Sequence, residues 1–315
     1  MRPLNARAEA ARIASFFLIA WAGACSDPVA QEVIDNRLPP GPDVAEPFPI
    51  DRGDDPGTPG SYKGLPLRLV DNGEPSVTAV DGIIGVICIG MSNGSQECED
   101  FIEKVDGLYS DEVGPFVRVV NCAVGGHAIE RWNDPGEDAD LWDRCLGQRL
   151  PNAGVRPDQV RVIWHKAANQ FTTVDGVPKP PYPSAESDHD AVLANLSVFA
   201  ERVRAKFPAV QAVHTSSRSY GGFSSNPGRG EPLSYEEGHA LNTWLRDHPM
   251  VDGVWYGWGP YLWAPECVTG ETNGGGICYV RSDYVNDGTH PSPDGRAKVS
   301  ELVHEAFRRY TWYRP

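Results

Sequence analysis

Three side chains that together can break an ester bond lie near opposite ends of this 315-residue chain. Ser92 lies within Gly-Met-Ser-Asn-Gly, while Asp287 and His290 lie within Asp-Gly-Thr-His-Pro. An imidazole can take the proton of a serine hydroxyl, and a carboxylate three residues earlier on a tight loop can fix the tautomer of that imidazole. The three residues are therefore candidates for a nucleophile, a general base and the acid that orients the base.

Two further segments could stabilise the oxyanion that such an attack creates. Gly125 and Gly126 are adjacent, and paired glycines let backbone N–H groups approach a ligand closely. Asn169 follows an apolar run and has an amide N–H that can donate to a developing negative charge. The backbone N–H of Ser92 itself would be a third donor, at the start of a helix.

Each segment alone also has an ordinary structural explanation. Ser92 could simply cap a helix, the paired glycines could form a plain turn, and Asn169 could cap the next turn. Asp287 could form an Asx turn beside a surface histidine. The chemical interpretation therefore depends on whether the fold brings the four segments together.

Alternating strands and helices are expected to position these segments. Short apolar runs predict buried strands at residues 83–89, 116–121, 159–164, 210–214 and 253–256. Longer amphipathic stretches between and after them predict helices at 96–105, 190–206, 235–246 and 294–310. This pattern predicts an α/β fold, a sheet of about five parallel strands with helices on both faces. Such folds place their sites beyond the carboxyl ends of the strands, where the segments with Ser92, Gly125 and Asn169 fall; the segment with Asp287 and His290 directly precedes the last predicted helix.

Taken in order, the four segments resemble the SGNH (GDSL-like) hydrolase family over residues 83–307. The resemblance implies a flavodoxin-like three-layer α/β/α sandwich. It implies that Ser92 is the nucleophile, that His290 is the general base and then acid, and that Asp287 orients it. The oxyanion hole would consist of the backbone N–H groups of Ser92 and Gly126 and the side chain of Asn169. Two segments depart from the family pattern: Met91 replaces its usual Asp, and the third segment reads Ala-Ala-Asn-Gln, without its usual Gly and Asp.

The resemblance implies a carboxylic ester hydrolase that forms an acyl-enzyme and needs no cofactor or metal. Within the family, Ser92-Asn93 and Gly-Gly-x-x-Ile-x-x-Trp look most like carbohydrate O-acetylesterases. Two segments near the fourth and fifth strands combine aromatic rings with hydroxyl and guanidinium donors, which suits a sugar ring. The expected substrate is an acylated glycan or small ester carrying a short, acetyl-like group. The residues expected to bind it are Asn93, Arg218, Trp258 and Trp263.

Two other functions fit parts of the same sequence. The pattern Gly90-x-Ser92-x-Gly94 also matches the nucleophile elbow of α/β-hydrolases, but there the elbow follows several strands and the acid lies far from the histidine. A non-catalytic, glycan-binding lipoprotein on the same fold would explain the altered first and third segments. Loss of esterase activity on substitution of Ser92 would distinguish a hydrolase from a binding protein.

The first 62 residues are expected to lie outside the folded domain. Residues 1–25 combine a basic start, an apolar core and small residues, which is typical of an export signal. Cys25 then resembles the lipidated first residue of a bacterial lipoprotein. Residues 26–62 are rich in Pro, Gly and acidic residues and predict a disordered tether. We therefore expect an exported protein whose domain spans residues 63–315, anchored to a membrane only through Cys25 and facing the periplasm or the cell exterior.

Export determines how the six remaining cysteines are interpreted. In an oxidising compartment an even number of cysteines favours disulfides. Cys267 and Cys278 flank a glycine-rich loop, so we expect this pair to be bonded. The pairing of the other four cannot be deduced from the sequence: Cys88, Cys98, Cys122 and Cys145.

The net charge of −15 argues against a nucleic-acid partner. Binding to phosphate backbones relies on clustered Lys and Arg, and the sequence has no basic run to supply them. Charged residues make up 23% of the chain, which is ordinary for a soluble globular domain.

Overall fold

The structure is a computed structural model that describes residues 69–182, 184–270, 272–273 and 276–315. The expected export signal, Cys25, the tether and the first residues of the expected domain lie outside the described residues. Within the described ranges, no helix is both long and apolar enough to cross a membrane.

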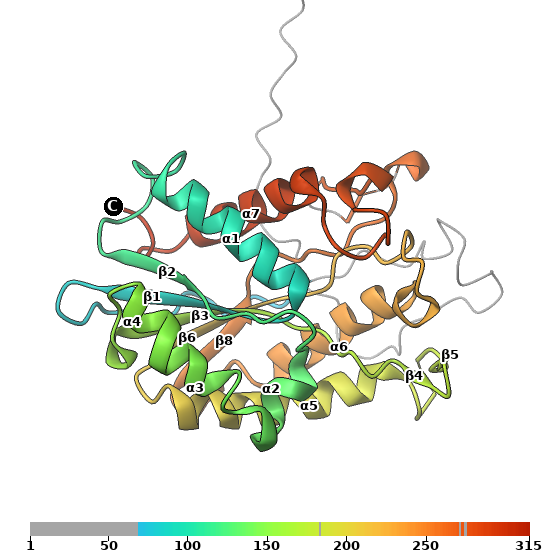
Figure 1. Ribbon diagram of the computed structural model, residues 1–315, viewed down its shortest axis with the longest axis horizontal. Helices are drawn as coiled ribbons and strands as arrows, with labels where there is room; N and C mark the ends of the chain where they lie inside the picture. Colours follow the sequence, from blue (N-terminus) through green and yellow to red (C-terminus); the bar gives the residue numbers. More distant parts are fainter. Residues whose placement is uncertain (1–68, 183, 271, 274–275) are drawn as a thin grey trace, which may run out of the picture. The chain divides into compact units, whose positions relative to one another are not determined.

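A six-stranded sheet forms the centre of the described region (Figure 1). Five of its strands are parallel and follow the spatial order β2 (Val117–Asn121), β1 (Ile84–Ile89), β3 (Val160–Lys166), β6 (Ala212–Ser216) and β8 (Val254–Trp258). If the parallel strands are numbered along the chain, this order is 2-1-3-4-5, the flavodoxin-like arrangement. The expected fold class and the five parallel strands are confirmed.

Two short hairpins were not expected from the sequence. Strand β7 (Met250–Val251) pairs antiparallel with β8, and β4 (Thr173–Val174) pairs antiparallel with β5 (Val177–Pro178). Both turn on an Asp-Gly pair in which each residue has a positive φ. That dipeptide is a strong signal for a two-residue hairpin, so the sequence did contain the information. The strand predicted at residues 253–256 therefore starts one residue too early, on the Gly of such a turn; the observed strand is β8.

Helices cover both faces of the sheet (Figure 1). Helices α1 (Ser92–Asp106) and α7 (Pro293–Phe307) pack against each other on one face. The other face is covered by α2 (Ile129–Asn133), α3 (Trp142–Arg144), α4 (Leu150–Asn152), α5 (Asp188–Lys206) and α6 (Leu233–Asp247). Single 3-10 turns occur at Pro135–Glu137, Pro157–Gln159, Pro227–Arg229, Cys267–Thr269 and Arg281–Asp283, and a π turn at Cys145–Arg149. The four expected helices are present, and the short α2, α3 and α4 were missed because they are too brief to show a helical period.

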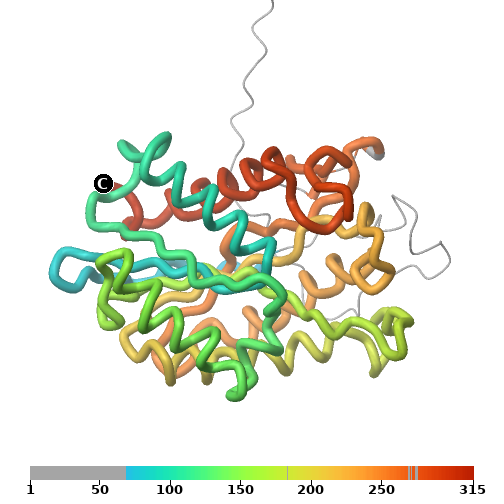
Figure 2. The backbone as a smooth tube through the Cα atoms, in the orientation of Figure 1, coloured from blue at the N-terminus to red at the C-terminus, as the bar shows by residue number. Residues whose placement is uncertain are grey.

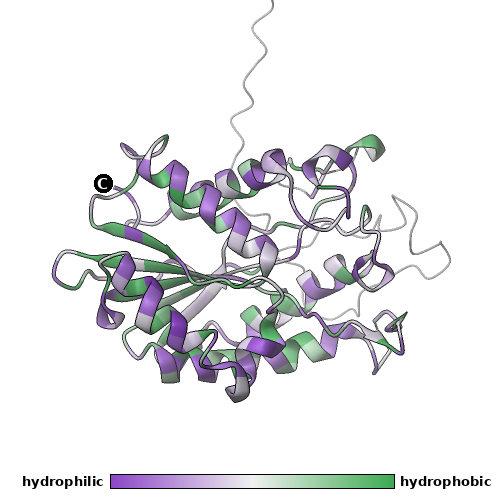
Figure 3. Cartoon of the chain, in the orientation of Figure 1, coloured by the Kyte–Doolittle hydropathy of each residue, from purple (hydrophilic) through white to green (hydrophobic). Residues whose placement is uncertain are grey.

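Strand β1 shows why the sheet is buried on both sides. All six of its residues are buried, and they alternate between two apolar clusters. Val86 and Cys88 face the cluster that includes Phe101 of α1, whereas Ile87 and Ile89 face the one that includes Phe199 of α5. Since successive side chains of a strand point to opposite faces, a continuous apolar run is what a two-sided core requires. The hydropathy colouring shows the same apolar centre (Figure 3).

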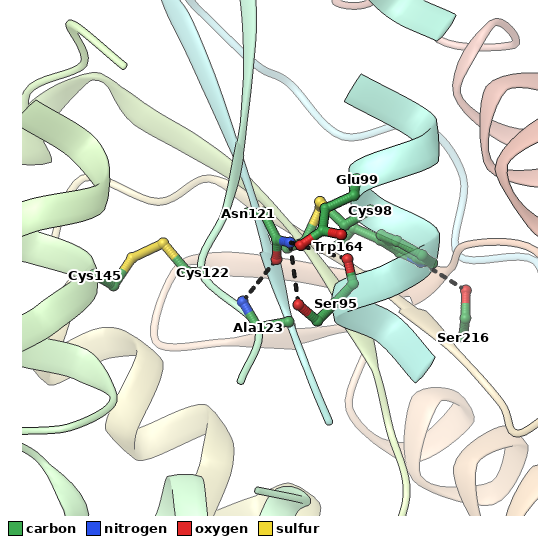
Figure 4. The surroundings of a disulfide bond; sticks show 10 residues. Ser95, Cys98, Glu99, Asn121, Cys122, Ala123, Cys145, Trp164 and Ser216 are labelled. Carbon is green, nitrogen blue, oxygen red and sulfur yellow. Dashed lines mark hydrogen bonds between the residues drawn. A yellow bond between two sulfur atoms is a disulfide. The ribbon is translucent and has the colours of Figure 1, made fainter. Parts of the chain in front are cut away.

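Three disulfides cross-link the described residues: Cys88–Cys98, Cys122–Cys145 and Cys267–Cys278. The first joins β1 to α1, and the second joins the end of β2 to the segment after α3 (Figure 4). Near these bonds, the amide of Asn121 donates to the backbone carbonyl of Ser95 at 2.9 Å and accepts from the backbone N–H of Ala123 (Figure 4). The hydrogen bond from Asn121 therefore ties the end of β2 to the start of α1, while each disulfide fixes one of these elements to its own neighbour.

Candidate active site

Ser92 is the first residue of α1, directly beyond the carboxyl end of β1. The residue at the N-cap position is Met91, so Ser92 is not the residue that caps this helix. Because β2 and β3 flank β1 on opposite sides, the chain leaves β1 at the point where the strand order reverses. Open α/β sheets bind ligands at that point.

The hydroxyl of Ser92 meets the imidazole of His290 at the carboxyl edge of the sheet. The distance between Ser92 Oγ and His290 Nε2 is 2.9 Å. Although the two residues are far apart in the chain, the turn from β1 into α1 and the segment that precedes α7 come together here (Figure 2). The side chains of His290 and Asp287 are 31% and 42% exposed, so solvent can reach them.

Asp287 holds the imidazole from the other side. Its Oδ2 lies 2.5 Å from His290 Nδ1, and its Oδ1 accepts from the backbone N–H groups of Thr289 and His290. Partial burial alone would raise the pKa of Asp287, but these hydrogen bonds outweigh it and lower the pKa to about 2. An ionised carboxylate is an acceptor only, so Nδ1 carries the proton and Nε2 is left to accept from the hydroxyl of Ser92.

Neighbouring segments fix the loop that holds Asp287 and His290. Gly288 has a φ of +65°, and a Cβ there would lie 1.7 Å from the carbonyl oxygen of Phe223. The backbone N–H of Ser225 donates to the carbonyl of Asp287 at 2.9 Å. Asn93, which we expected to bind substrate, donates one amide N–H to the carbonyl of Thr289 at 2.8 Å. This bond ties the residue after Ser92 to the loop, so Asn93 aligns two parts of the site.

The turn after β2 lies against Ser92. A Cβ added at Gly125 would lie 3.8 Å from Ser92 Cβ, and the N–H of Val124 donates to the carbonyl of Gly90 at 3.0 Å. Gly126 is exposed and has a φ of +77°, in the left-handed region that favours glycine. The structure thus brings Gly125, the first of the paired glycines, next to the side chain of Ser92.

Asn169 follows β3 and is buried, with 1% of its surface exposed. Its Nδ2 donates to Asp188 at 3.1 Å, and its Oδ1 accepts from Asn195 at 2.9 Å. Both partners belong to α5. An amide has two N–H groups, and the bond to Asp188 uses one of them.

Three residues that we expected to bind substrate are core residues. Arg218 is buried and donates to Glu237 at 2.6 Å and to the carbonyl of Asn169. Trp258 is buried and donates to Asn242 at 2.9 Å, and Trp263 is buried and donates to Glu231 at 3.1 Å. A buried Trp or Arg must find a polar partner, and the side chains that serve here, Glu231, Glu237 and Asn242, come from the loop before α6 or from α6 itself. The aromatic and guanidinium groups after the fourth and fifth parallel strands therefore support the fold.

Sequence reasoning missed Phe171, which is 51% exposed. It comes two residues after Asn169, and its backbone N–H donates to Glu130 of α2 at 3.0 Å. The guanidinium of Arg131, also on α2, lies 5.3 Å from the ring centroid. An aromatic ring left half exposed beside α2 is a candidate binding surface. Phe171 is hard to recognise from the sequence, since a single Phe in a polar loop forms no hydrophobic pattern.

A buried ion pair was also missed. Lys166, the last residue of β3, donates to both carboxylate oxygens of Glu97 at 2.6 and 2.7 Å, and both side chains are almost fully buried. Glu97 lies on α1, one turn beyond Ser92. The pair joins the strand that leads to Asn169 to the helix that begins at Ser92.

The described residues contain no group of three or more His, Cys, Asp or Glu side chains that could hold a metal ion.

No family model matches the chain, and no curated protein sequence matches it. Solved structures do resemble it. A carbohydrate esterase of family 3 from Talaromyces cellulolyticus has a TM-score of 0.45 and 10% identity, over 71% of this chain and 95% of that one. A catalytic mutant of an acetylxylan esterase from Geobacillus stearothermophilus has a TM-score of 0.43 and 13% identity, over 76% and 100% of the two chains.

A lipase/acylhydrolase from Enterococcus faecalis is similar at a TM-score of 0.43 and 12% identity, over 72% of this chain and 96% of that one. Likeness of this degree concerns the fold alone.

Proposed function

We propose that this protein is a serine esterase that acts through an acyl-enzyme. The observation that supports the proposal is the continuous hydrogen-bonded chain from Ser92 Oγ through His290 to Asp287, with distances of 2.9 and 2.5 Å. A serine activated in this way is the arrangement that acyl transfer uses on several unrelated folds.

In the first step, Ser92 Oγ attacks the ester carbonyl while His290 Nε2 takes the hydroxyl proton. The tetrahedral intermediate collapses, the proton passes from His290 to the departing alcohol, and the acyl group stays on Ser92. Water then attacks the acyl-enzyme with His290 again as base, releasing the carboxylic acid and restoring the serine. Asp287 stays ionised throughout and stabilises the imidazolium.

The proposed oxyanion hole contains three donors: the backbone N–H groups of Ser92 and Gly126 and the second N–H of the Asn169 amide. Its support is positional. Ser92 begins a 15-residue helix, Gly126 belongs to the turn packed on Ser92, and Asn169 follows the neighbouring strand. Removing one such donor typically costs roughly 3 kcal/mol of transition-state stabilisation.

The proposed substrate is a carbohydrate that carries a short acyl group, with acetyl as the first choice. Arg218, Trp258 and Trp263 no longer support this, because they are buried. The support now comes from Phe171 with Arg131 at its face. An aromatic face next to guanidinium donors suits the C–H face and hydroxyl groups of a sugar better than a long acyl chain.

We also propose that the protein is exported and anchored through Cys25. In its support, all six cysteines of the described residues are paired in three disulfides, which persist in oxidising compartments. The test is incorporation of labelled palmitate into the full chain in a bacterial host, with Cys25→Ser as control. Equal labelling of both proteins would reject the anchor.

The test of the activity compares the full chain with Ser92→Ala on p-nitrophenyl acetate. The expected result is turnover that falls by at least about 10³-fold in the variant, because the nucleophile is lost. Turnover that survives the substitution would reject Ser92 as the nucleophile and with it the proposed esterase. A wild type without turnover would reject the esterase and favour the non-catalytic glycan-binding protein. Acetate release from a panel of acetylated polysaccharides would then identify the glycan.

A further inference from the structure

Four of the polar groups of Asn169 are bound by residues from other elements. Its backbone N–H donates to Glu237 of α6 at 3.0 Å, and its backbone carbonyl accepts from Arg218, which follows β6. Its side-chain amide is bound at both ends by Asp188 and Asn195 of α5. The second N–H of the amide is the polar group that these four bonds do not use.

Arg218 and Glu237 hold the peptide group on each side of Asn169 through one shared contact. The guanidinium Nε of Arg218 donates to Glu237 Oε2 at 2.6 Å, while Glu237 Oε1 accepts from Asn169 N. Both side chains are almost fully buried. A planar guanidinium can reach a carboxylate and a carbonyl at the same time, whereas a lysine ammonium on a flexible stem has no such fixed fork.

Asp188 links the two halves of this network. It accepts from the Asn169 amide and from Lys179 at 3.2 Å, and it contacts the carboxyl group of Glu237. Burial raises the pKa of Glu237 well above its usual range, the charge of Arg218 opposes the shift, and Asp188 adds to it. Asp188 therefore connects the carboxyl group of Glu237 to the side-chain amide of Asn169.

We infer that Arg218 and Glu237 are positioning residues that hold Asn169 so that its second amide N–H is directed to the oxyanion. This inference rests on the proposed function, because it concerns the same reaction. Neither residue contacts the reacting atoms; they act through Asn169. Since a donor misplaced by about 1 Å can cost about 10²-fold in rate, loosening the network should slow the chemical step and leave ester binding nearly unchanged.

The test measures kcat and KM for p-nitrophenyl acetate in the full chain. Arg218→Lys should lower kcat by about 10- to 100-fold with KM within about threefold, and Asn169→Ala should lower kcat by about 100- to 1000-fold. The double variant Arg218→Lys/Asn169→Ala should have a kcat no lower than that of Asn169→Ala alone. Substitutions in residues that act as a unit do not have additive effects on the activation free energy. A purely structural role would lower the melting temperature without this dependence on Asn169.

Arg202→Lys is the matched control. Arg202 is a partly buried, ion-paired arginine on α5, bonded to Asp138, and its replacement should leave kcat within about twofold. Asn195→Ala is a second variant that leaves the buried Arg218 in place. Asn195 is only half-buried, so we expect its replacement to disturb folding less. It removes the donor to Asn169 Oδ1 and should lower kcat by about 3- to 10-fold.

Three results would overturn the inference while leaving the esterase intact. These are an unchanged kcat in Arg218→Lys, an unchanged kcat in Asn169→Ala, and losses that multiply in the double variant. Absence of Ser92-dependent turnover in the wild type would instead reject the proposed function, and the inference with it.

Discussion

Ser92 Oγ and His290 Nε2 lie 2.9 Å apart although 198 residues separate them in the chain. The contact is secured by a second one beside it, from the amide of Asn93 to the carbonyl of Thr289 at 2.8 Å. Consecutive residues at the start of α1 therefore bind consecutive residues of the loop before α7. Two bonds between the same short segments restrict rotation as well as distance, which is what a near-attack arrangement requires.

Asp287→Asn should lower kcat by about 10²- to 10⁴-fold while keeping the loop folded. The remaining side-chain oxygen can still accept from the backbone, but an NH₂ group would oppose His290 Nδ1–H. The imidazole would then favour the tautomer with its proton on Nε2, facing the hydroxyl of Ser92, where it cannot act as a base. Steady-state kinetics with p-nitrophenyl acetate measure the effect. A variant with wild-type kcat would show that Asp287 does not orient the base.

The pKa of about 2 for Asp287 also predicts a pH dependence of stability. This pKa lies below the unfolded value of about 3.9, so ionised Asp287 stabilises the fold fully above pH about 4 and loses that contribution as the pH falls towards 2. Because the side chain is 42% exposed, screening keeps the contribution under about 1 kcal/mol.

Urea unfolding of wild type and Asp287→Asn measures this contribution. The difference in unfolding free energy should be largest at neutral pH and should narrow between pH about 4 and 2. The carboxylate stays ionised above this window, so an acidic fall in kcat/KM above pH about 4 has another cause. A difference that stays constant down to pH about 2 would contradict the assigned shift.

Gly288→Ala should destabilise the protein and abolish most activity. A Cβ at this position would lie 1.7 Å from a backbone oxygen of Phe223, and the backbone cannot move away without shifting Asp287. We expect a loss of at least about 2 kcal/mol in unfolding free energy. Gly73→Ala is the control, since Gly73 has a similar φ of +72° and open space around its Cα. Gly73→Ala should lower the unfolding free energy by only about 1 kcal/mol and leave kcat unchanged. Equal costs would mean that the contact with Phe223 does not matter.

Removal of the Cys88–Cys98 disulfide should affect activity more than removal of Cys267–Cys278. The two bonds close loops of nearly equal length, with sequence separations of 10 and 11, so their entropic contributions are similar at about 2–3 kcal/mol. Cys88 and Cys98 are also fully buried and join β1 to α1 on either side of Ser92. Double alanine variants compared by urea unfolding and kcat measure both effects. A larger loss of kcat in Cys267→Ala/Cys278→Ala would contradict this assignment.

Phe171→Ala should raise KM for an acetylated oligosaccharide by up to about tenfold and leave p-nitrophenyl acetate hydrolysis unchanged. The reason is that the ring is proposed to contact the sugar and has no part in the proposed acyl transfer, and such an aromatic contact contributes about 0.5–1.5 kcal/mol. Val177→Ala, which removes another exposed apolar side chain from the following hairpin, is the control. If both substrates lost activity equally, Phe171 would support the oxyanion loop and not bind sugar.

Much of the fold could be predicted because its signals are local. The run from Ile84 to Ile89 is apolar at every position, which indicates a strand covered on both faces. The Asp252-Gly253 pair is an equally local signal for a hairpin turn, but Gly253 was interpreted as the start of a strand. The short α2 could not be found from periodicity, since five residues do not complete two turns.

Within the site, the sequence alone determined which residues can do chemistry. It also determined the contact between Asp287 and His290, because a spacing of three residues on a tight loop leaves few other arrangements. Only the tertiary structure decided which polar side chains reach solvent. Arg218 is buried because Glu237 and Asn169, from α6 and from the loop after β3, meet its guanidinium there. A guanidinium looks the same in sequence whether it faces a substrate or a carboxylate, since its partner is set by chain segments that become neighbours only when the sheet and its helices pack.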